Sequence, residues 1–487
     1  MGIRGAIVAA ICVMAVAPSC GSGSSGGSSA GGGDDGGASS SGGSGGSGSG
    51  SGGSSGAGSS SGGSGSGGGS GGSSSGSGSS SSSSGGIAGD GGTCFGSAFL
   101  AALGKKNLML GGSMAAATAK AAPFDLQYQY VSGGFADGNG PCASCASGCT
   151  SNGGTKNCSN AGGGCSWWGC WQYDQDPPGE YVRTFDSTCA GESPAQVPMI
   201  TYYQILQGSG VTEGAPEVTQ AATDATFMGR YFADWRFLLQ QIGMSTALLH
   251  IEPDFWGYAE QHASDPTTEQ AAVATANPTD CGSMPDTIAG MGQCMIAMVR
   301  KYAPHALVAL HASAWSTNMD VAGNTDPNLD VAGEAQKTAA FLAACGESSA
   351  DFVVVETSDR DAGYYQCNGR NTWWDATNTT LPTFHQDFAW VKALTEALNK
   401  PALYWQTPLG NMTVADVCPE PSSGTITWHD NRVDYFLGHM SELAAAHAVG
   451  AAFGAGAGDQ TTPETDGNNL VTKAKAYYSA GGQALCP

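Results

Sequence analysis

The chain has 487 residues and is strongly acidic, with 41 Asp and Glu residues against 18 Lys and Arg residues and a formal net charge of −23. Proteins that bind nucleic acid contact its phosphates through clustered cations, so this charge balance argues against a nucleic-acid partner. Residues 93–487, which have the composition of a folded domain, are long for one ordinary domain but normal for one barrel that carries insertions.

Residues 1–20 have the pattern of a secretory signal peptide, with one early cation at Arg4 and an apolar stretch too short to span a bilayer stably. The run from Val16 to Cys20 resembles a bacterial lipobox, with Ala17 where that pattern usually has Leu. Cys20 would then be lipidated, and ordinary signal-peptidase cleavage nearby is the alternative. We expect a secreted protein on a bacterial cell surface or outer membrane, whose only membrane contact is this anchor.

Residues 21–92 consist almost wholly of Gly and Ser and have too few apolar residues to build a core. Such a composition predicts a flexible, disordered tether. Its mean reach, on the order of 45 Å for about 70 residues, would hold a monomeric folded domain away from a surface.

The chain has 16 cysteines, of which Cys12 and Cys20 lie in the signal region, so that 16 − 2 = 14 remain. An even number in an exported chain predicts up to seven disulfides. Six of these cysteines lie in a Gly- and Asn-rich insertion at about 133–193: Cys142, Cys145, Cys149, Cys158, Cys165 and Cys170. Zinc is the alternative, but no second Cys-x-x-Cys and no nearby His complete a tetrahedral site.

Eight short apolar runs of strand length follow one another along the chain: 108–112, 124–131, 198–206, 246–252, 306–312, 351–357, 401–407 and 450–456. Segments with helical spacing lie between them, at 218–241, 285–303, 384–399 and 431–448. Several runs are apolar on both alternations, as in a sheet covered on both faces. The sequence therefore predicts an α/β fold of the (β/α)8 TIM type, with an open, doubly wound sheet as the alternative.

Polar and aromatic residues gather where these runs end, which in a barrel is the rim that carries the chemistry. Two glutamates, Glu252 and Glu356, each end an apolar run, and Asp254 follows the first. We expect Glu252 to be the proton donor of a glycosidic cleavage, Glu356 its partner and Asp254 a further catalytic carboxylate, because such cleavage needs two carboxyl groups. Phe255 and Trp256 could raise the pKa of the donor. The alternative is that these acids are structural hydrogen-bond partners.

Aromatic rings and polar side chains at the same ends would bind the sugar. The expected substrate-binding residues are Tyr203, Gln204, Trp256, His311, Trp315, Trp405, Gln406 and Asp459. His250 and His311 end neighbouring runs, but no His-x-His spacing accompanies them, so we expect neither a catalytic metal nor a cofactor. A structural calcium ion at Asp359-x-Asp361 or at residues 136–140 is an open alternative.

Two families resemble the chain at these motifs. The position of Glu252 at the end of the fourth run is similar to the acid/base of retaining (β/α)8 glycosidases, although Gln406 stands where that clan has its nucleophilic Glu. "LLHIEPD" at 248–254, "ALVALHASAW" at 306–315 and "ETDG" at 464–467 resemble glycoside hydrolase family 6, whose catalytic acid would fall within 202–208, where this chain has no carboxylate. Both resemblances imply a carbohydrate-active barrel.

Three classes of function remain open. The first is a glycoside hydrolase that cleaves a polysaccharide or oligosaccharide. The second is a non-catalytic carbohydrate-binding barrel, which is favoured by Gln406 and by the lack of a carboxylate at 202–208. Another secreted hydrolase or a structural surface protein is the third.

Overall fold

The computed structural model describes residues 95–132, 135, 149–152, 155–158, 179–414, 418, 426–456 and 460–486. The predicted signal peptide with Cys20, the tether, most of the Cys-rich insertion, the 136–140 motif and Asp459 lie outside these residues. Among the helices that are described, none is both long and apolar enough to cross a membrane.

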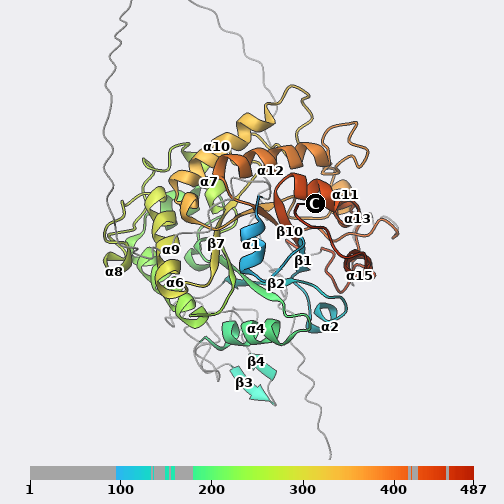
Figure 1. Cartoon of the computed structure of the whole chain (residues 1–487). Helices are drawn as coiled ribbons and strands as arrows, with labels where there is room; N and C mark the ends of the chain where they lie inside the picture. The colour runs from blue at the N-terminus through green and yellow to red at the C-terminus, as the bar shows by residue number, and fades with distance from the viewer. Residues whose placement is uncertain are drawn as a thin grey trace, which may run out of the picture.

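Eight parallel strands close into a barrel in the order β1-β10-β9-β8-β7-β6-β5-β2 (Figure 1). Their bounds are β1 Met109–Gly112, β2 Leu126–Ser132, β5 Val197–Tyr203, β6 Leu248–Ile251, β7 Leu307–Ala312, β8 Val353–Glu356, β9 Ala402–Thr407 and β10 Ala448–Phe453. Each strand overlaps one of the eight predicted runs, so the predicted TIM-type barrel is confirmed. The open, doubly wound sheet is wrong, because β1 pairs with β10.

Helices surround the barrel (Figure 1). Their bounds are α1 Ser97–Ala102, α2 Ala116–Ala119, α4 Glu180–Gly191, α5 Ile205–Ser209, α6 Ala225–Ile242, α7 Phe255–His262, α8 Pro278–Cys281, α9 Ile288–Tyr302, α10 Val331–Ala344, α11 Ala362–Cys367, α12 Phe384–Leu398, α13 Arg432–Gly438, α14 Met440–Ala445 and α15 Asn469–Ser479. A π-helical turn, Glu217–Ala221, precedes α6, and β3 Cys149–Asn152 pairs with β4 Thr155–Cys158 in an antiparallel hairpin.

Capping side chains set several helix starts. Asp224 accepts hydrogen bonds from the first-turn amides of α6, and Thr287 and Thr383 do the same for α9 and α12. The helix predicted at 431–448 divides into α13 and α14 at His439, whose backbone leaves the helical region at φ −132°. Every residue of β6, β7, β9 and β10 is buried, as the two-sided apolar runs predict for strands that helices cover.

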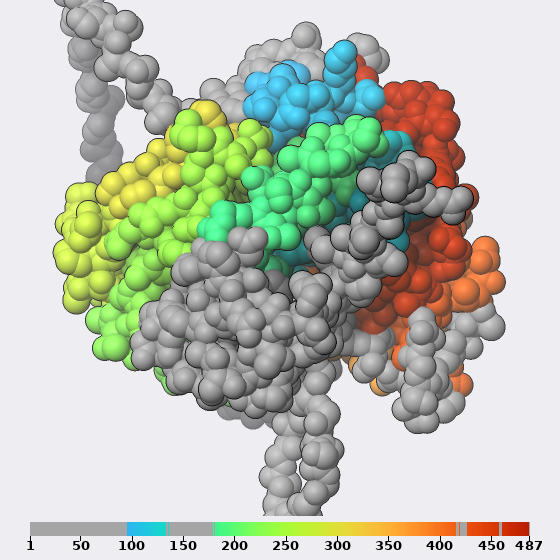
Figure 2. Space-filling model, turned by 90° about the horizontal axis from the view of Figure 1, so that it is seen from below, coloured from blue at the N-terminus to red at the C-terminus, as the bar shows by residue number. Residues whose placement is uncertain are grey.

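The seam that closes the barrel depends on a glycine. Gly450 of β10 faces Met109 of β1 in the strand register, and a Cβ at Gly450 would lie 2.9 Å from the Met109 Cβ, closer than real Cβ atoms approach. On the face of the molecule that Figure 2 shows, the blue start of the described chain adjoins its red end. The glycine in the last run therefore allows tight strand packing at the seam.

Gly450→Ala should lower the melting temperature, because overpacking a core position costs about 1–3 kcal/mol. Gly438→Ala is the matched control, since nothing lies within 4 Å of a Cβ at that position, in the last turn of α13. Thermal unfolding followed by circular dichroism measures both. Equal melting temperatures for the two variants would contradict this account of the seam.

The cysteine prediction is correct for some residues and wrong for two. Disulfides join Cys281 to Cys294 and Cys367 to Cys418, and Cys486 is also oxidised. Cys189 and Cys345, however, are buried free thiols. The expectation that all 14 exported cysteines pair is therefore wrong for these two, which fill space in the core as small apolar side chains.

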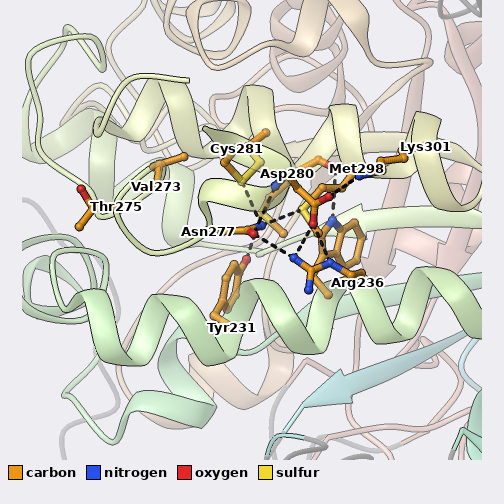
Figure 3. Close-up of a disulfide and its surroundings, with 12 residues drawn as sticks. Tyr231, Arg236, Val273, Thr275, Asn277, Asp280, Cys281, Met298 and Lys301 are labelled. Atoms are coloured by element: carbon orange, nitrogen blue, oxygen red, sulfur yellow. Dashed lines mark hydrogen bonds and ion pairs between the residues drawn. A yellow bond between two sulfur atoms is a disulfide. The ribbon is translucent and has the colours of Figure 1, made fainter. Parts of the chain in front are cut away.

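The Cys281–Cys294 disulfide fastens α8 to α9 beside a polar cluster (Figure 3). From α6, Arg236 donates hydrogen bonds to Asn277 at 2.9 Å and to Asp280 at 2.6 Å. The segment before α9 is thereby held to α9 by a covalent bond and to α6 by charged contacts.

Alkylation of the unreduced protein tests this assignment of thiols. Peptides that contain Cys189 and Cys345 should take up the reagent after denaturation and not before, because burial hides both thiols and raises their pKa, that of Cys189 to about 12. Cys281 and Cys294 should stay unmodified until a reductant is added. Peptide mass mapping that found Cys189 or Cys345 in a disulfide would refute the assignment.

Candidate active site

The turn after β6 has an unusual backbone. Glu252 has φ 46° and Asp254 has φ 67°, in a region of φ that residues other than glycine rarely adopt. Gln406, near the end of β9, has φ 53°. Each such residue costs on the order of 1–3 kcal/mol, and such conformations concentrate at functional sites. Three of them at this one rim of the barrel mark it as the candidate site.

The carboxyl group of Glu252 points away from solvent. It is fully buried, and its Oε1 accepts hydrogen bonds from the backbone N–H of Gln204 at 3.0 Å and of Ile205 at 3.2 Å. These amides belong to the start of α5, so Glu252 links the end of β6 to the helical turn after β5. Burial raises the pKa of Glu252 to about 8, although the two amides act in the opposite direction.

Asp254, His311 and Glu356 come together instead. They follow or end β6, β7 and β8, and one ligating atom of each lies within 4.8 Å of those of the other two. Nε2 of His311 is 3.7 Å from Oε1 of Glu356. Both carboxylates are half-buried and the imidazole is fully buried. The structure thus brings two of the three predicted catalytic acids together, and it holds Glu252 apart from them.

Asp254 is in an environment that favours its protonated form. Loss of hydration raises its pKa well above the ordinary value, and the negative charges of Glu356 and Glu213 raise it further. Glu213 lies in the loop between α5 and α6 and accepts a 2.7 Å hydrogen bond from the hydroxyl of Tyr258. Two nearby carboxyl groups with different environments can divide the roles of acid and base.

A buried hydrogen-bond chain supports His311 from below. Oγ1 of Thr201 lies 3.2 Å from Nδ1 of His250, and Nε2 of His250 lies 3.0 Å from Nδ1 of His311. Burial and the neighbouring His311 lower the pKa of His250 well below its ordinary value, so its ring is neutral. Both nitrogens of His250 and one of His311 are engaged, and Nε2 of His311 faces the carboxylates.

The predicted aromatic residues divide between the site and the core. Trp315 is half-buried and packs on Tyr258 with ring centroids 4.9 Å apart, and Gly257 leaves the room that its ring occupies. Tyr203 is also half-buried. Trp256 and Trp405 are each only 1% exposed, so neither offers an open face to a sugar as expected.

The two predicted glutamines are also buried. Gln204 contributes its backbone amide to Glu252, and the side chain of Gln406 accepts a hydrogen bond from the hydroxyl of Tyr130. Asp361, of the suspected calcium motif, accepts hydrogen bonds from the amides of Gly410 and Thr461, both at 2.9 Å. These contacts are structural ones, made within the rim.

Sequence reasoning missed Glu213 and Tyr258 as members of the site. Glu213 lies beyond the end of its strand, in a loop with no periodicity, and nothing in the sequence places it beside Asp254. Tyr258 follows Trp256 by two residues, so the two side chains lie on roughly opposite faces of α7. This helical spacing could have indicated that Tyr258 faces the site when Trp256 is buried.

Neither a protein-family model nor a curated protein matches the chain. Among solved structures, GH26C from Muricauda sp. aligns with 78% of this chain and 88% of its own, at 10% identity and a TM-score of 0.43. A double mutant of the Cellulomonas fimi endo-β-1,4-mannanase aligns with 80% and 76%, at 10% identity and a TM-score of 0.41. The Cel6 endoglucanase from Mycobacterium tuberculosis aligns with 50% of this chain, at 13% identity and a TM-score of 0.24, and the chain spans 60% of its length. At these scores the chemistry has to be argued from the site itself.

The buried carboxyl of Glu252 predicts a specific pH dependence of stability. Its folded pKa of about 8 lies above the ordinary 4.5, so the folded state keeps a proton that the unfolded state releases. The contribution is complete below about pH 4.5 and is lost as pH rises through about 8. Glu252→Gln should therefore lose less stability than the wild type between about pH 5 and about pH 9.

Melting temperatures of both proteins across that range measure the difference. Glu396→Gln, which removes an exposed carboxylate of α12, is the control and should behave as the wild type does. Parallel pH curves for the wild type and Glu252→Gln would show that the Glu252 carboxyl does not titrate in this range.

Proposed function

We propose that the protein is a glycoside hydrolase that cleaves a polysaccharide with Asp254 and Glu356 as its two carboxyl groups. The observation that carries this proposal is their approach to within 4.8 Å at the rim of the barrel, on either side of the end of β7. Glycosidic cleavage uses two carboxyl groups that flank the scissile bond, and these two face one another at the rim. The earlier choice of Glu252 as the donor gives way to Asp254, because the Glu252 carboxyl is sealed from solvent.

Asp254 takes the role of general acid and Glu356 that of nucleophile. The raised pKa of Asp254 keeps a proton available for the leaving oxygen near neutral pH. Retaining enzymes hold their two carboxyl groups about 5–5.5 Å apart, and inverting enzymes hold them about 6.5–9.5 Å apart. The short approach here favours retention of configuration through a covalent glycosyl–enzyme intermediate on Glu356.

The aromatic side chains beside the two acids suit a pyranose ring. Trp315 and Tyr258 pack together, and Tyr203 lies close enough to Asp254 for the charge of that residue to raise the tyrosine pKa. Aromatic faces pack on the apolar C–H faces of a sugar, whereas the carboxylates accept its hydroxyl protons. The protein would act outside the cell, anchored through Cys20 and held off the surface by residues 21–92.

Substitution of the two acids tests the proposal. On a polysaccharide that the wild type cleaves, Asp254→Asn and Glu356→Gln should each lose at least about a hundredfold in turnover, in line with general-acid contributions of 10²–10⁴. The limb of the pH–rate profile that falls at high pH reports Asp254, because the reaction needs its proton, and Asp254→Asn should abolish that limb. Glu269→Gln, at an ion pair with His262 on the far end of α7, is the control.

Glu252→Gln decides between the sequence-based and the geometric assignment. Normal turnover in this variant supports Asp254 as the acid, and a hundredfold loss with unchanged stability would restore Glu252 to that role. Product configuration, followed by NMR from the first turnover, tests retention, and an inverted product would contradict the proposed nucleophile.

A binding-only barrel is the second candidate. It is favoured by Gln406, an uncharged, buried side chain that is hydrogen-bonded to Tyr130 where retaining barrel glycosidases have their nucleophile. Sugar binding without any cleavage across a broad panel of glycans would establish this candidate and refute hydrolysis.

A further inference from the structure

We propose that Asp254, His311 and Glu356 form a binding site for a divalent transition-metal ion such as Zn²⁺. One imidazole nitrogen and two carboxylate oxygens converge there from three adjacent strands, with all three ligating atoms within 4.8 Å of one another. Three protein ligands and one open position are the arrangement of many reactive zinc sites. The inference goes beyond hydrolysis, since metal binding is measured without any sugar.

The state of His311 is an independent reason to expect a ligand. Its side chain is fully buried, yet Nε2 makes no hydrogen bond and points toward Glu356 at 3.7 Å. A buried polar atom without a hydrogen bond is unfavourable and requires a cause. A metal ion beside both carboxylates would supply the missing partner.

The hydrogen-bond chain behind His311 gives the tautomer that metal binding needs. If Nε2 of His311 carries the lone pair, Nδ1 carries the proton and donates a hydrogen bond to Nε2 of His250 over 3.0 Å. Nδ1 of His250 then carries its own proton and donates to Oγ1 of Thr201 over 3.2 Å. All four ring nitrogens then have consistent roles. A histidine that binds a metal ordinarily donates a hydrogen bond through the N–H of its second ring nitrogen in this way.

The local charge also favours a cation. The carboxylates of Glu356, Glu213 and Asp359 lie near enough to Asp254 to act on it electrostatically. Within the described part of the rim, the guanidinium of Arg360 pairs with Asp359 at 3.1 Å. The half-buried acids thus carry more negative charge than this cation neutralises, and a dication would relieve their repulsion.

The donor set indicates which metals fit. Calcium and magnesium take oxygen ligands, whereas an imidazole suits zinc, cobalt or nickel. Tetrahedral zinc with bonds of about 2.0–2.2 Å places its ligands about 3.4 Å apart. The two carboxylates are half-buried and end short side chains, so small rotations would close the remaining gap. The three ligands show no metal-binding spacing along the chain, because each comes from the end of a different strand.

Titration of the full-length, EDTA-treated protein with Co²⁺ tests the site. We expect one Co²⁺ per chain in this site, with the visible d–d bands of nitrogen and oxygen ligation, and displacement by Zn²⁺ but not by Ca²⁺. Glu356→Gln should weaken binding by at least about tenfold, because loss of even an outer-shell partner costs 10–100-fold in affinity. Asp254→Asn provides the same test if Glu356→Gln does not fold.

Glu269→Gln is the matched control, since it removes the carboxylate of another His–Glu pair, 3.0 Å from His262, and should leave Co²⁺ binding unchanged. Absence of stoichiometric binding would overturn the proposal, as would full affinity in a folded Glu356→Gln. A thiolate-to-cobalt charge-transfer band that accounts for all bound metal would assign the site to cysteines and overturn it equally.

A further consequence rests on the proposed function. If Asp254 and Glu356 carry out hydrolysis, Zn²⁺ should inhibit it in competition with the glycan, with the affinity that the titration gives. Binding without any hydrolysis would leave the metal site intact and refute only the proposed reaction. Stoichiometric binding together with hydrolysis that Zn²⁺ does not inhibit would refute Asp254 and Glu356 as the hydrolytic pair, whereas hydrolysis without metal binding would refute the metal site.

Discussion

The buried carboxyl of Glu252 fixes the turn on which the candidate site depends. It accepts hydrogen bonds from the first amides of α5, so the ends of β5 and β6 are held together below the rim. The same turn contains two residues with positive φ, at a cost that only a firmly held backbone can sustain. In consequence Asp254, two residues later, lies beside Glu356 instead of following the outward course of a continuing strand.

A layer of buried rings lies under the two acids. Trp405 contacts His250 with ring centroids 4.7 Å apart and His311 with centroids 5.8 Å apart, and the two imidazoles stack at 5.1 Å. Polar rings are stable in a barrel interior only when they are hydrogen-bonded, which Thr201 and the histidines achieve among themselves. Two ring nitrogens of the layer, Nε1 of Trp405 and Nε2 of His311, make no hydrogen bond, and the second lies 3.7 Å from Glu356 at the rim. The packing of the core is thereby coupled to the chemistry above it.

The fold was readable from the sequence because eight apolar runs of strand length alternate with segments of helical spacing, patterns that depend on local periodicity alone. The site was readable only in part. Glu356 and His311 end their strands regularly, so their direction follows from alternation. Glu252 and Asp254 are separated by a turn with positive φ, which exchanges the buried and the exposed acid, and no composition rule predicts it. Glu213 comes from an aperiodic loop, where only the three-dimensional structure reveals a neighbour.

The two proposals for the site have one electrostatic origin. Glycosidic cleavage develops positive charge on the sugar, and crowded carboxylates stabilise such a charge as they would stabilise a metal ion. What distinguishes the two is the location of a proton. Hydrolysis needs Asp254 protonated, whereas metal binding needs it ionised and needs Nε2 of His311 unprotonated. The pKa of Asp254, raised by burial and by Glu356, therefore favours the hydrolytic state at low pH and the metal-binding state as pH rises. Because both states use the same oxygen atoms, the site can occupy only one of them at a time.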